Sequence, residues 1–336
     1  MEVVTLSAVI GIDVGGTRIK SVVITSTGAV LDELVLPTPQ RISDCLGAVV
    51  AELVRDHLVR LAGREAGFEK VAAVGVVVPG VVDDVLGIGL YSSNLGWRDL
   101  DLRGRIESEL DLPLAVGHDV RAGLLAEHRF GAAVGADNAV FVPLGTGIAS
   151  AVLSGGRLLA DPRSGEIGHV VVRPDGPPCG CGASGCLETI ASARAIGRRF
   201  TERLRSVGSL SATSTVPATS VPSTAADVAA LVAVAFGASG CAAGVDPRTQ
   251  AALEVWDEAV EALASVLAPV VVALGTETVL IGGGLVRSGE TLLGPLRRAV
   301  ALRLGAGLTV EVRAAALGDR AGSLGAGVLA LAVIGA

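Results

Sequence analysis

Short apolar runs separated by glycine-rich turns recur along the chain. Residues 7–14 (SAVIGIDV) and 18–25 (RIKSVVIT) are both largely apolar, and they flank a Gly-Gly-Thr turn at 15–17. This arrangement predicts two strands joined by a hairpin, with the glycines at its tip. Residues 29–36 (AVLDELVL) predict a third strand.

The next segments alternate between helical and strand patterns. Apolar residues at three- and four-residue spacing between Asp44 and Gly63 predict a helix that Asp44 caps and Gly63 ends. Residues 71–78 (VAAVGVVV) are continuously apolar, which is typical of a central strand covered on both faces. A shorter strand is predicted at 114–117 and a helix at 120–129.

A second strand–turn–strand unit at 139–153 (AVFVPLGTGIASAVL) has the layout of the first one. The sequence therefore predicts two halves of similar topology. Residues 206–224 are rich in Ser, Thr and Pro and indicate a surface insertion within the second half. A strand at 278–281 leads into three glycines, and residues 319–333 predict a helix that packs back onto the body.

Composition narrows the class of protein. The 336 residues suffice for two domains, 50% are hydrophobic, and 45 glycines without a Gly-X-Y period exclude collagen. The formal charge of −7 argues against nucleic-acid binding. The most apolar stretch, 263–281, is interrupted by Pro269 and Glu277 and is too short to span a membrane. Glu2 stands where a secretory signal has a cationic region, so we expect a soluble cytoplasmic α/β protein.

Cysteine and histidine spacing predicts a metal site. One imidazole and three thiolates lie close together in the chain as His169, Cys179, Cys181 and Cys186. This set fits a closed tetrahedral zinc site with a structural role, whereas the alternative is a loop of free thiols. The remaining two cysteines, Cys45 and Cys241, are expected to be small buried residues.

Three glycine-rich turns follow apolar strands at 13–17, 144–148 and 282–284. Adjacent glycines allow backbone N–H groups to approach a phosphate, and Asp13 would be available to a magnesium ion. Each turn alone could be a simple bend. Together they favour a nucleotide bound in a cleft between the two halves.

Several carboxylates and histidines are further candidates. Asp119 follows a short strand and begins a helix, so it is either an N-cap or a catalytic group. Glu166 and Glu188 flank the metal motif and could accept hydrogen bonds from sugar hydroxyls. His118 lies beside Asp119 and is retained as a candidate, whereas His57 and His128 are expected to be surface or core residues.

The motifs together resemble the ROK family of repressors, open reading frames and sugar kinases. They are DVGGT (13–17), PGVVD (79–83), SNLGW (93–97), HDVRAGLLAE (118–127), LGTGI (144–148), GEIGH (165–169), CGCGASGCLE (179–188), IGGG (281–284) and LGDRAGSLGAG (317–327). The resemblance implies an α/β, two-lobed, actin-like (ribonuclease H-like) ATPase fold with an interlobe cleft and a structural zinc loop. The implied small lobe is 1–117 with the C-terminal helix 319–336. The large lobe is 118–318, with the zinc loop at 165–188 and the insertion at 206–224.

The resemblance also implies a role for each matching residue. Asp119 is the expected general base. The expected sugar contacts are Asn94, His118, Asp119, Glu166, His169 and Glu188. The expected ATP contacts are Asp13, Gly15, Gly16, Thr17, Gly145, Thr146, Gly147, Gly282 and Gly283. Family kinases usually carry Asn-Asp where this chain has His118-Asp119.

The expected function is ATP-dependent transfer of a phosphoryl group to a hexose hydroxyl, with glucose as the first candidate. Another sugar (N-acetylmannosamine, N-acetylglucosamine, mannose or fructose) and a non-catalytic sugar-sensing regulator are the alternatives. Regulators of the family carry an N-terminal helix-turn-helix, for which a first strand at about residue 7 leaves no room. We expect Zn²⁺ as a structural ion, Mg²⁺ with ATP, and a homodimer or homotetramer.

Overall fold

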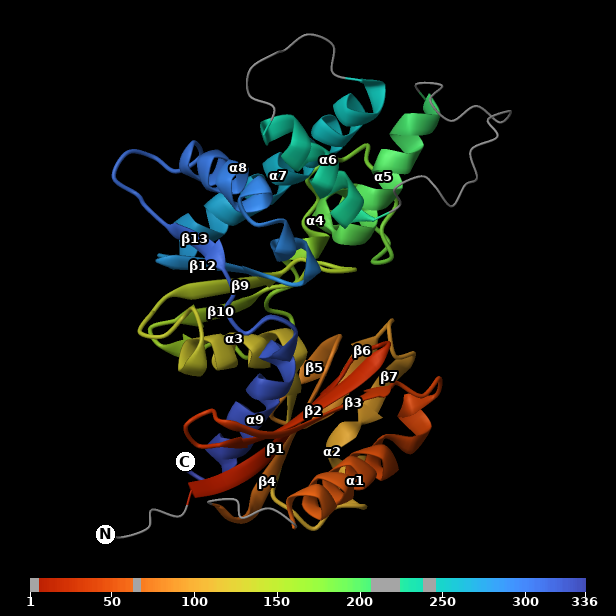
Figure 1. The fold of residues 1–336 in the computed structure, drawn as a ribbon, viewed down its shortest axis with the longest axis vertical. Helices are drawn as coiled ribbons and strands as arrows, with labels where there is room; N and C mark the ends of the chain where they lie inside the picture. Colours follow the sequence, from red (N-terminus) through yellow and green to blue (C-terminus); the bar gives the residue numbers. More distant parts are fainter. Residues whose placement is uncertain (1–5, 63–67, 207–223, 238–245) are drawn as a thin grey trace.

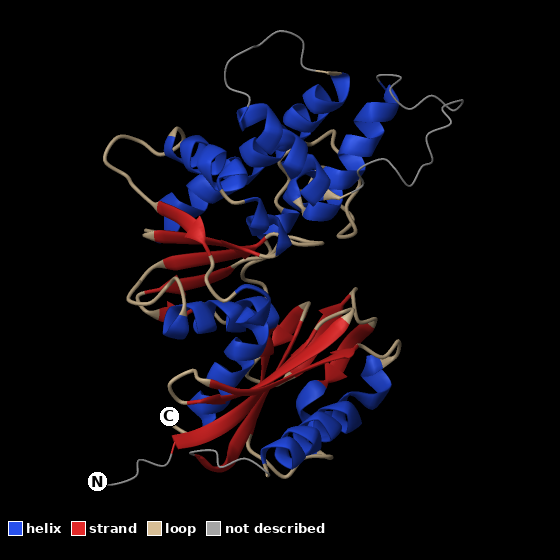
Figure 2. Cartoon of the chain, viewed as in Figure 1, coloured by secondary structure: helices blue, strands red, loops and turns tan. Residues whose placement is uncertain are grey.

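The computed structural model describes residues 6–62, 68–206, 224–237 and 246–336. Two five-stranded sheets dominate the fold, and helices lie on both faces of each sheet (Figures 1 and 2). In each sheet, three antiparallel strands are followed by two strands that run parallel to the third. The predicted pair of halves with similar topology is therefore confirmed.

The first half contains the following elements. Its main sheet has the order β3 (Val30–Pro37), β2 (Arg18–Thr25), β1 (Leu6–Val14), β4 (Phe68–Val78) and β8 (Leu114–His118). A separate three-stranded sheet contains β5 (Val81–Asp83), β6 (Ile88–Ser92) and β7 (Trp97–Asp101). The helices are α1 (Ile42–Leu61), α2 (Leu102–Glu107) and α9 (Ala321–Val333), the last preceded by the 3-10 turn η4 (Gly318–Arg320).

The second half has its own set. Its sheet has the order β11 (Arg157–Leu158), β10 (Ala151–Ser154), β9 (Ala139–Pro143), β12 (Thr278–Gly282) and β13 (Glu311–Ala314). The helices are α3 (Asp119–Phe130), α4 (Leu187–Ala191), α5 (Ala193–Ser206), α6 (Ala225–Gly237), α7 (Pro247–Leu274) and α8 (Glu290–Ala301). Two 3-10 turns are η1 (Ile167–His169) and η3 (Gly284–Ser288).

Most predicted elements agree with these bounds. The strands predicted at 7–14 and 18–25 are β1 and β2, and the predicted C-terminal helix is α9. Asp44 is not the cap of α1, because that helix begins at Ile42 and Asp44 lies in its first turn. Gly63, Cys241 and nearly all of the insertion 206–224 lie outside the described residues.

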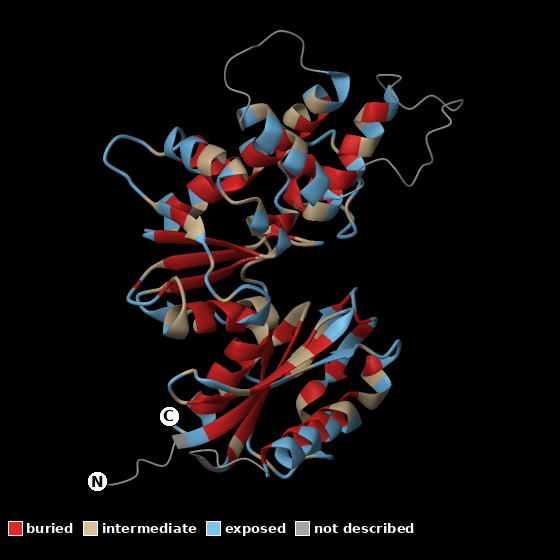
Figure 3. Ribbon diagram, in the orientation of Figure 1, coloured by how far each residue is buried: buried red, intermediate tan, exposed pale blue. Residues whose placement is uncertain are grey.

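The two faces of the first sheet are buried by different helices. Alternate residues of β1 point to opposite faces, as in any strand. Ile10 and Ile12 belong to a core with α1, whereas Val9 packs with Leu324 and Leu331 of α9. Figure 3 shows the central part of this strand buried, whereas the edge strand β3 is mostly exposed.

Helix α9 lies unusually close to the first sheet. A Cβ placed on Gly11 would lie 2.0 Å from the Ser323 carbonyl oxygen, and one on Gly75 would lie 1.8 Å from that of Ala326. Because no side chain fits at these two positions, the peptide groups of strand and helix pack directly against each other. The predicted return of the C-terminal helix to the body is confirmed.

Helices α3 and α9 lie between the two sheets and pack against each other (Figure 1). Leu124 of α3 belongs to a core with Phe141 of the second sheet, while α9 covers the first sheet. The fully buried Glu127 carboxylate accepts hydrogen bonds from the N–H groups of Ala132, Ala316 and Leu317, at 2.7, 3.1 and 2.8 Å. This residue therefore joins the two segments that connect the halves.

None of the helices in the described ranges has both the length and the apolar character needed to cross a bilayer. The apolar stretch 263–281 is divided between α7 and β12, and α7 ends at Leu274, where Gly275 forms its C-cap in the left-handed conformation.

A buried polar chain ties α1 to the edge of the first sheet. The Ser21 hydroxyl and His57 Nε2 lie 2.8 Å apart, and His57 Nδ1 lies 2.9 Å from Asp32 Oδ2. The Arg60 guanidinium donates two hydrogen bonds to the Asp32 carboxylate. Ser21, His57 and Asp32 are all buried, so this Ser-His-Asp arrangement is part of the core. Of the surface and core positions that the sequence left open for His57, the structure shows the core position.

The buried Ser21–His57–Asp32 arrangement predicts that the stability of the protein depends on pH. Burial lowers the pKa of His57 despite the bond to Asp32, so the unfolded chain binds more protons below about pH 6.5 and stability falls as the pH drops from about 7 to 5. His57→Gln should lose about 1–3 kcal/mol at pH 7 and flatten this pH dependence. Calorimetric Tm values at pH 5, 6 and 7 test it. His128→Gln, at a half-buried position of α3, serves as the control, and an equally steep profile in His57→Gln would refute the assignment.

Candidate active site

Two carboxylates meet at one edge of the first sheet. Asp13 is the penultimate residue of β1, and Asp119 follows β8 directly as the first residue of α3. Strands β1, β4 and β8 are parallel, so their carboxyl ends share this edge. Burial and the nearby Asp13 charge raise the pKa of Asp119 to about 7. Burial raises the pKa of Asp13 to about 6, while the Lys20 ammonium acts against this.

Lys20 lies opposite Asp13 in the hairpin register. Its ammonium donates a hydrogen bond of 2.9 Å to the Asp319 carbonyl in η4, and so the hairpin is held against the start of α9. A Cβ on Gly322, the second residue of α9, would lie 2.5 Å from Asp13 Oδ2. The Asp13 carboxylate is thus enclosed between β2 and the first turn of this helix.

Gly16 and Thr17 of the hairpin tip are exposed, and the tip is braced from one side. The Thr38 hydroxyl donates to the Gly15 carbonyl at 2.6 Å, and the Thr38 N–H donates to the Thr17 carbonyl at 3.0 Å. Asn94, on the β6–β7 turn, lies beside the tip, since a Cβ on Gly16 would be 3.6 Å from Asn94 Cβ. The turn 15–17, predicted to contact ATP, and Asn94, predicted to contact the sugar, therefore lie next to each other.

The cap of α3 is His118, so of the two roles that the sequence left open for Asp119 the N-cap is wrong. His118 Nδ1 accepts a hydrogen bond of 3.4 Å from the Arg121 N–H. Burial, reinforced by the Arg121 charge, lowers the pKa of His118 to about 3, so the ring is neutral and Nε2 carries its proton. Nε2 lies 3.3 Å from Asp119 Oδ1. A sugar hydroxyl could reach this nitrogen only by competing with Asp119.

The glycine loops of the second sheet adjoin each other. The Leu144 N–H donates to the Gly282 carbonyl, and the Leu285 N–H donates to the Leu144 carbonyl. The predicted sets 144–148 and 282–284 therefore form one surface, in which Thr146 is exposed.

The glycines of this surface differ in how much space surrounds them. A Cβ on Gly283, where φ is +74°, would lie 2.5 Å from the Leu144 carbonyl oxygen, and one on Gly282 would lie 2.5 Å from the Phe141 ring. In contrast, a Cβ on Gly145 would meet nothing within 4 Å. Packing explains the first two glycines, whereas Gly145 leaves a space that a ligand could fill.

The predicted metal ligands converge. One ligand atom from each of His169, Cys179, Cys181 and Cys186 lies within 4.8 Å of all the others. His169 Nδ1 is 3.5 Å from Cys179 Sγ, and the Sγ atoms of Cys181 and Cys186 are 3.6 Å apart. These separations match the edge of a tetrahedron around a Zn²⁺ ion, about 3.8 Å for Zn–S bonds of about 2.3 Å. The residues present therefore fit this ion.

Glu166 and Glu188 lie beside this cluster. His169 Nε2, on the far side of the ring from Cys179, is 3.7 Å from Glu166 Oε2. Burial raises the pKa of Glu166, the charge on His169 lowers it, and the charge on Glu188 raises it. Glu188 Oε2 also accepts a hydrogen bond of 2.9 Å from the Ile148 N–H, which connects the cluster to the glycine loop.

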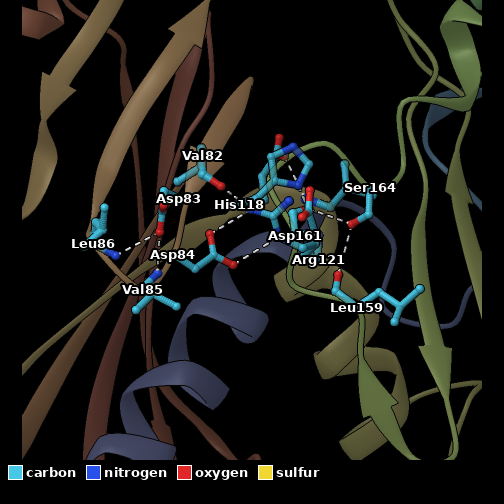
Figure 4. A network of polar contacts seen from close by, with 12 residues as sticks. Val82, Asp83, Asp84, Val85, Leu86, His118, Arg121, Leu159, Asp161 and Ser164 are labelled. Carbon is cyan, nitrogen blue, oxygen red and sulfur yellow. Dashed lines mark hydrogen bonds and ion pairs between the residues drawn. The ribbon is translucent and has the colours of Figure 1, made fainter.

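Two neighbours of the site were missed by sequence reasoning. Lys20 could have been found, because a two-stranded hairpin with its tip at 15–17 places it opposite Asp13. Arg121 carried no such signal. It is buried beside the catalytic candidates and bonded to Asp84, a contact that only the tertiary structure creates (Figure 4).

Comparison with known proteins places this geometry in a family. The model of the ROK family matches residues 9–333. The chain belongs to the ROK family. The resemblance expected from the motifs is confirmed.

A curated relative and two solved ROK structures resemble this chain over nearly its whole length. A glucokinase of Halalkalibacterium halodurans is 35% identical over 328 residues, which cover 95% of this chain and 94% of that protein. The ROK hexokinase of Thermus thermophilus superposes with a TM-score of 0.75 at 30% identity, covering 98% and 99% of the two chains. The ROK family glucokinase of Streptomyces griseus, solved in complex with glucose and AMPPNP, gives 0.74 at 29% identity over 96% and 99%. The two-sheet α/β arrangement is thus the actin-like ATPase fold of ROK kinases.

Proposed function

We propose that this ROK protein is an ATP-dependent sugar kinase that transfers the γ-phosphoryl group of ATP to a hexose hydroxyl, with glucose as the substrate. The observation that carries the proposal is the Asp119 carboxyl, which lies beside Asp13 and has a pKa raised to about 7. A general base works best when its pKa lies near the working pH. The similarity to glucokinases and a hexokinase over nearly the whole chain supports the same activity.

In the proposed reaction, Asp119 accepts the proton of the attacking sugar hydroxyl. The hydroxyl oxygen forms a bond to the γ-phosphorus while the bond from that phosphorus to the β-γ bridging oxygen breaks, and ADP leaves. The protein contributes mainly position and charge to such a transfer. The Nε2–H of His118 faces Asp119 Oδ1, so it is placed to hold the carboxylate in one orientation.

The nucleotide is proposed to bind through the glycine loops of both halves. The contacts are Asp13, Gly15, Gly16, Thr17, Gly145, Thr146, Gly147, Gly282 and Gly283. A magnesium ion bound with ATP would neutralise phosphate charge, and Asp13 is the residue that would hold it or its water shell. We further propose lobes of 1–117 with 319–336 and of 118–318, with the cleft between them.

The sugar is proposed to contact Asn94, Glu166, His169 and Glu188 beside Asp119. Carboxylates accept hydrogen bonds from hydroxyl groups, and Glu166 Oε2 lies 3.7 Å from His169 Nε2, with the Glu188 charge close enough to raise the pKa of Glu166. Because His169 Nδ1 faces the cysteines, Nε2 is the nitrogen left for the sugar side of the ring.

The Cys-His cluster is proposed to hold a structural zinc ion through His169, Cys179, Cys181 and Cys186. Burial raises the pKa of the Cys186 thiol to about 12, so a thiolate at this position requires a nearby cation. The ion would fix the orientation of His169. Because Cys186 precedes α4, it would also position Glu188 in the first turn of that helix.

The glycine loops give the first prediction of this function. Gly145→Ala should leave the stability within about 0.5 kcal/mol but raise the KM for ATP about tenfold, because the new methyl fills the space for a phosphate. Gly283→Ala should lose about 1–3 kcal/mol of stability, since Ala is strained at this φ and meets the Leu144 backbone. Thermal unfolding and ATP titrations measure both effects. An unchanged KM for ATP in Gly145→Ala would contradict the phosphate assignment.

The proposed base gives the second prediction. Asp119→Asn should lower kcat by ~10²–10⁴ while the sugar affinity stays within several-fold. In the unmodified protein, kcat/KM should rise with pH through about pH 7 and then level off, and the midpoint belongs to the Asp13–Asp119 pair. An ADP-release assay across glucose, mannose, fructose, N-acetylglucosamine and N-acetylmannosamine, combined with sugar calorimetry, tests the activity and its substrate. Asp44→Asn, on the exposed side of α1, is the control. Full activity in Asp119→Asn would exclude it as the base.

Metal content gives the third prediction. Elemental analysis should find one zinc per chain, and Cys181→Ser should lose it, lower the Tm and raise the KM for sugar, because metal binding contributes to local folding. Cys45→Ser on α1 should keep the ion. A zinc-free protein with three titratable thiols in the cluster would refute the site.

A further inference from the structure

Arg121 lies two residues after the proposed base, in the first turn of α3, and only 2% of its surface is exposed. We propose that Arg121 is a positioning residue that holds the three-stranded sheet β5–β7, which carries the sugar contact Asn94, at a set distance from Asp119. This inference rests on the proposed sugar kinase function. It concerns how Asn94 and Asp119, on two sides of the proposed sugar site, are held at a fixed separation.

The contact is a two-pronged ion pair with a third bond to the backbone. Arg121 Nε lies 3.0 Å from Asp84 Oδ2, and Nη2 lies 2.8 Å from Asp84 Oδ1. The same Nη2 donates a hydrogen bond of 2.7 Å to the Val82 carbonyl of β5. Only a planar guanidinium can make all three bonds at once, so lysine is no substitute here.

The turn that bears Asp84 is shaped to present it. Asp83 Oδ1 accepts hydrogen bonds from the N–H groups of Val85 and Leu86, at 3.1 and 2.9 Å. Both of these apolar side chains are exposed, at 83% and 60%, so the tip of the turn has no apolar anchor of its own. Figure 4 shows the Arg121 fork reaching this turn from α3. The ion pair is therefore a principal tether of the tip.

The tether ends next to the base. A Cβ on Gly117 of β8 would lie 3.7 Å from Asp84 Cγ, so the carboxylate rests on the strand that leads into His118 and Asp119. On the other side of Arg121, Figure 4 shows the loop that carries Asp161 and Ser164, which follows β11 in the second half. Asp161 is engaged by the Arg163 guanidinium, at 3.2 Å, so Asp84 is the carboxylate that Arg121 holds.

Asn94 moves with the tethered sheet. It lies on the turn between β6 and β7, and β6 pairs with both β5 and β7. Val82 is fully buried and keeps β5 in the core of the first half. Loss of the fork should therefore free mainly the turn that follows β5, and through the pairing of β5 with β6 Asn94 should shift relative to Asp119. Because misplacement by about 1 Å can cost as much as 10²-fold in a well-oriented reaction, such a shift should weaken sugar use.

The test is a double-mutant cycle of Arg121→Gln, Asp84→Asn and the double variant, with Arg121→Lys in addition. Each single variant should raise the KM for sugar about tenfold and leave the KM for ATP within about twofold. The double variant should show the effect of one single variant and not the product of two, because both side chains act through one contact. Arg60→Gln removes the same kind of fork on Asp32, far from the site, and should leave both KM values unchanged.

Amide hydrogen exchange supplies a readout that needs no activity. Arg121→Gln should speed exchange in 81–90 while α9 stays protected. Unchanged exchange there, an unchanged KM for sugar, or equal rises in both KM values would overturn the inference. If the unmodified protein phosphorylates none of the sugars, the proposed function fails, whereas faster exchange in Arg121→Gln would still support the tether.

Discussion

The direct contact between α9 and the first sheet is the constraint on which the rest of this molecule depends. At Gly11 and Gly75 the peptide groups of strand and helix meet without any side chain between them, so the helix cannot be moved without separating backbones. Helix α9 in turn packs on α3 at Gly325, where a Cβ would lie 2.0 Å from the Ala122 carbonyl. The two helices thus transmit the position of one sheet to the other. The buried Glu127 carboxylate joins the segments by which the chain crosses between the halves.

The catalytic candidates lie where this constraint brings strand ends and helix starts together. Asp13 lies near the end of β1 beside the first turn of α9, and Asp119 begins α3 after β8. Burial of each carboxyl at this sheet edge is the main reason why the pKa of both is raised, and the Asp13 charge raises that of Asp119 further. Lys20 opposes this effect at Asp13 but reaches it from the neighbouring strand. The same packing that stabilises the fold therefore sets the proton affinity of the proposed base.

A second chain of contacts, within the second half, runs from the Cys-His cluster to the glycine loop at 144–148. Cys186 lies at the start of α4, Glu188 lies in its first turn, and the Glu188 carboxylate accepts a hydrogen bond from Ile148. The orientation of the proposed sugar contact and the shape of the proposed phosphate surface are therefore coupled through one side chain. An ion in the cluster would act on both, since it would hold the cysteine that begins the helix.

The sequence by itself determined the local elements and the chemistry of the site. Apolar runs and the glycine tip predicted β1, β2 and their hairpin, the spacing of His169 and the three cysteines predicted a cluster that does converge, and the motifs identified the ROK family. These signals are local, because hydrogen bonding within a hairpin and ligand spacing within a loop depend on near neighbours. Only the tertiary structure decided that His118 caps α3 in place of Asp119, that His57 is sealed in a core with Ser21 and Asp32, and that Arg121 grips Asp84. Each of these roles depends on burial and on a partner distant in the chain, and neither quantity has a period or a spacing that a sequence displays.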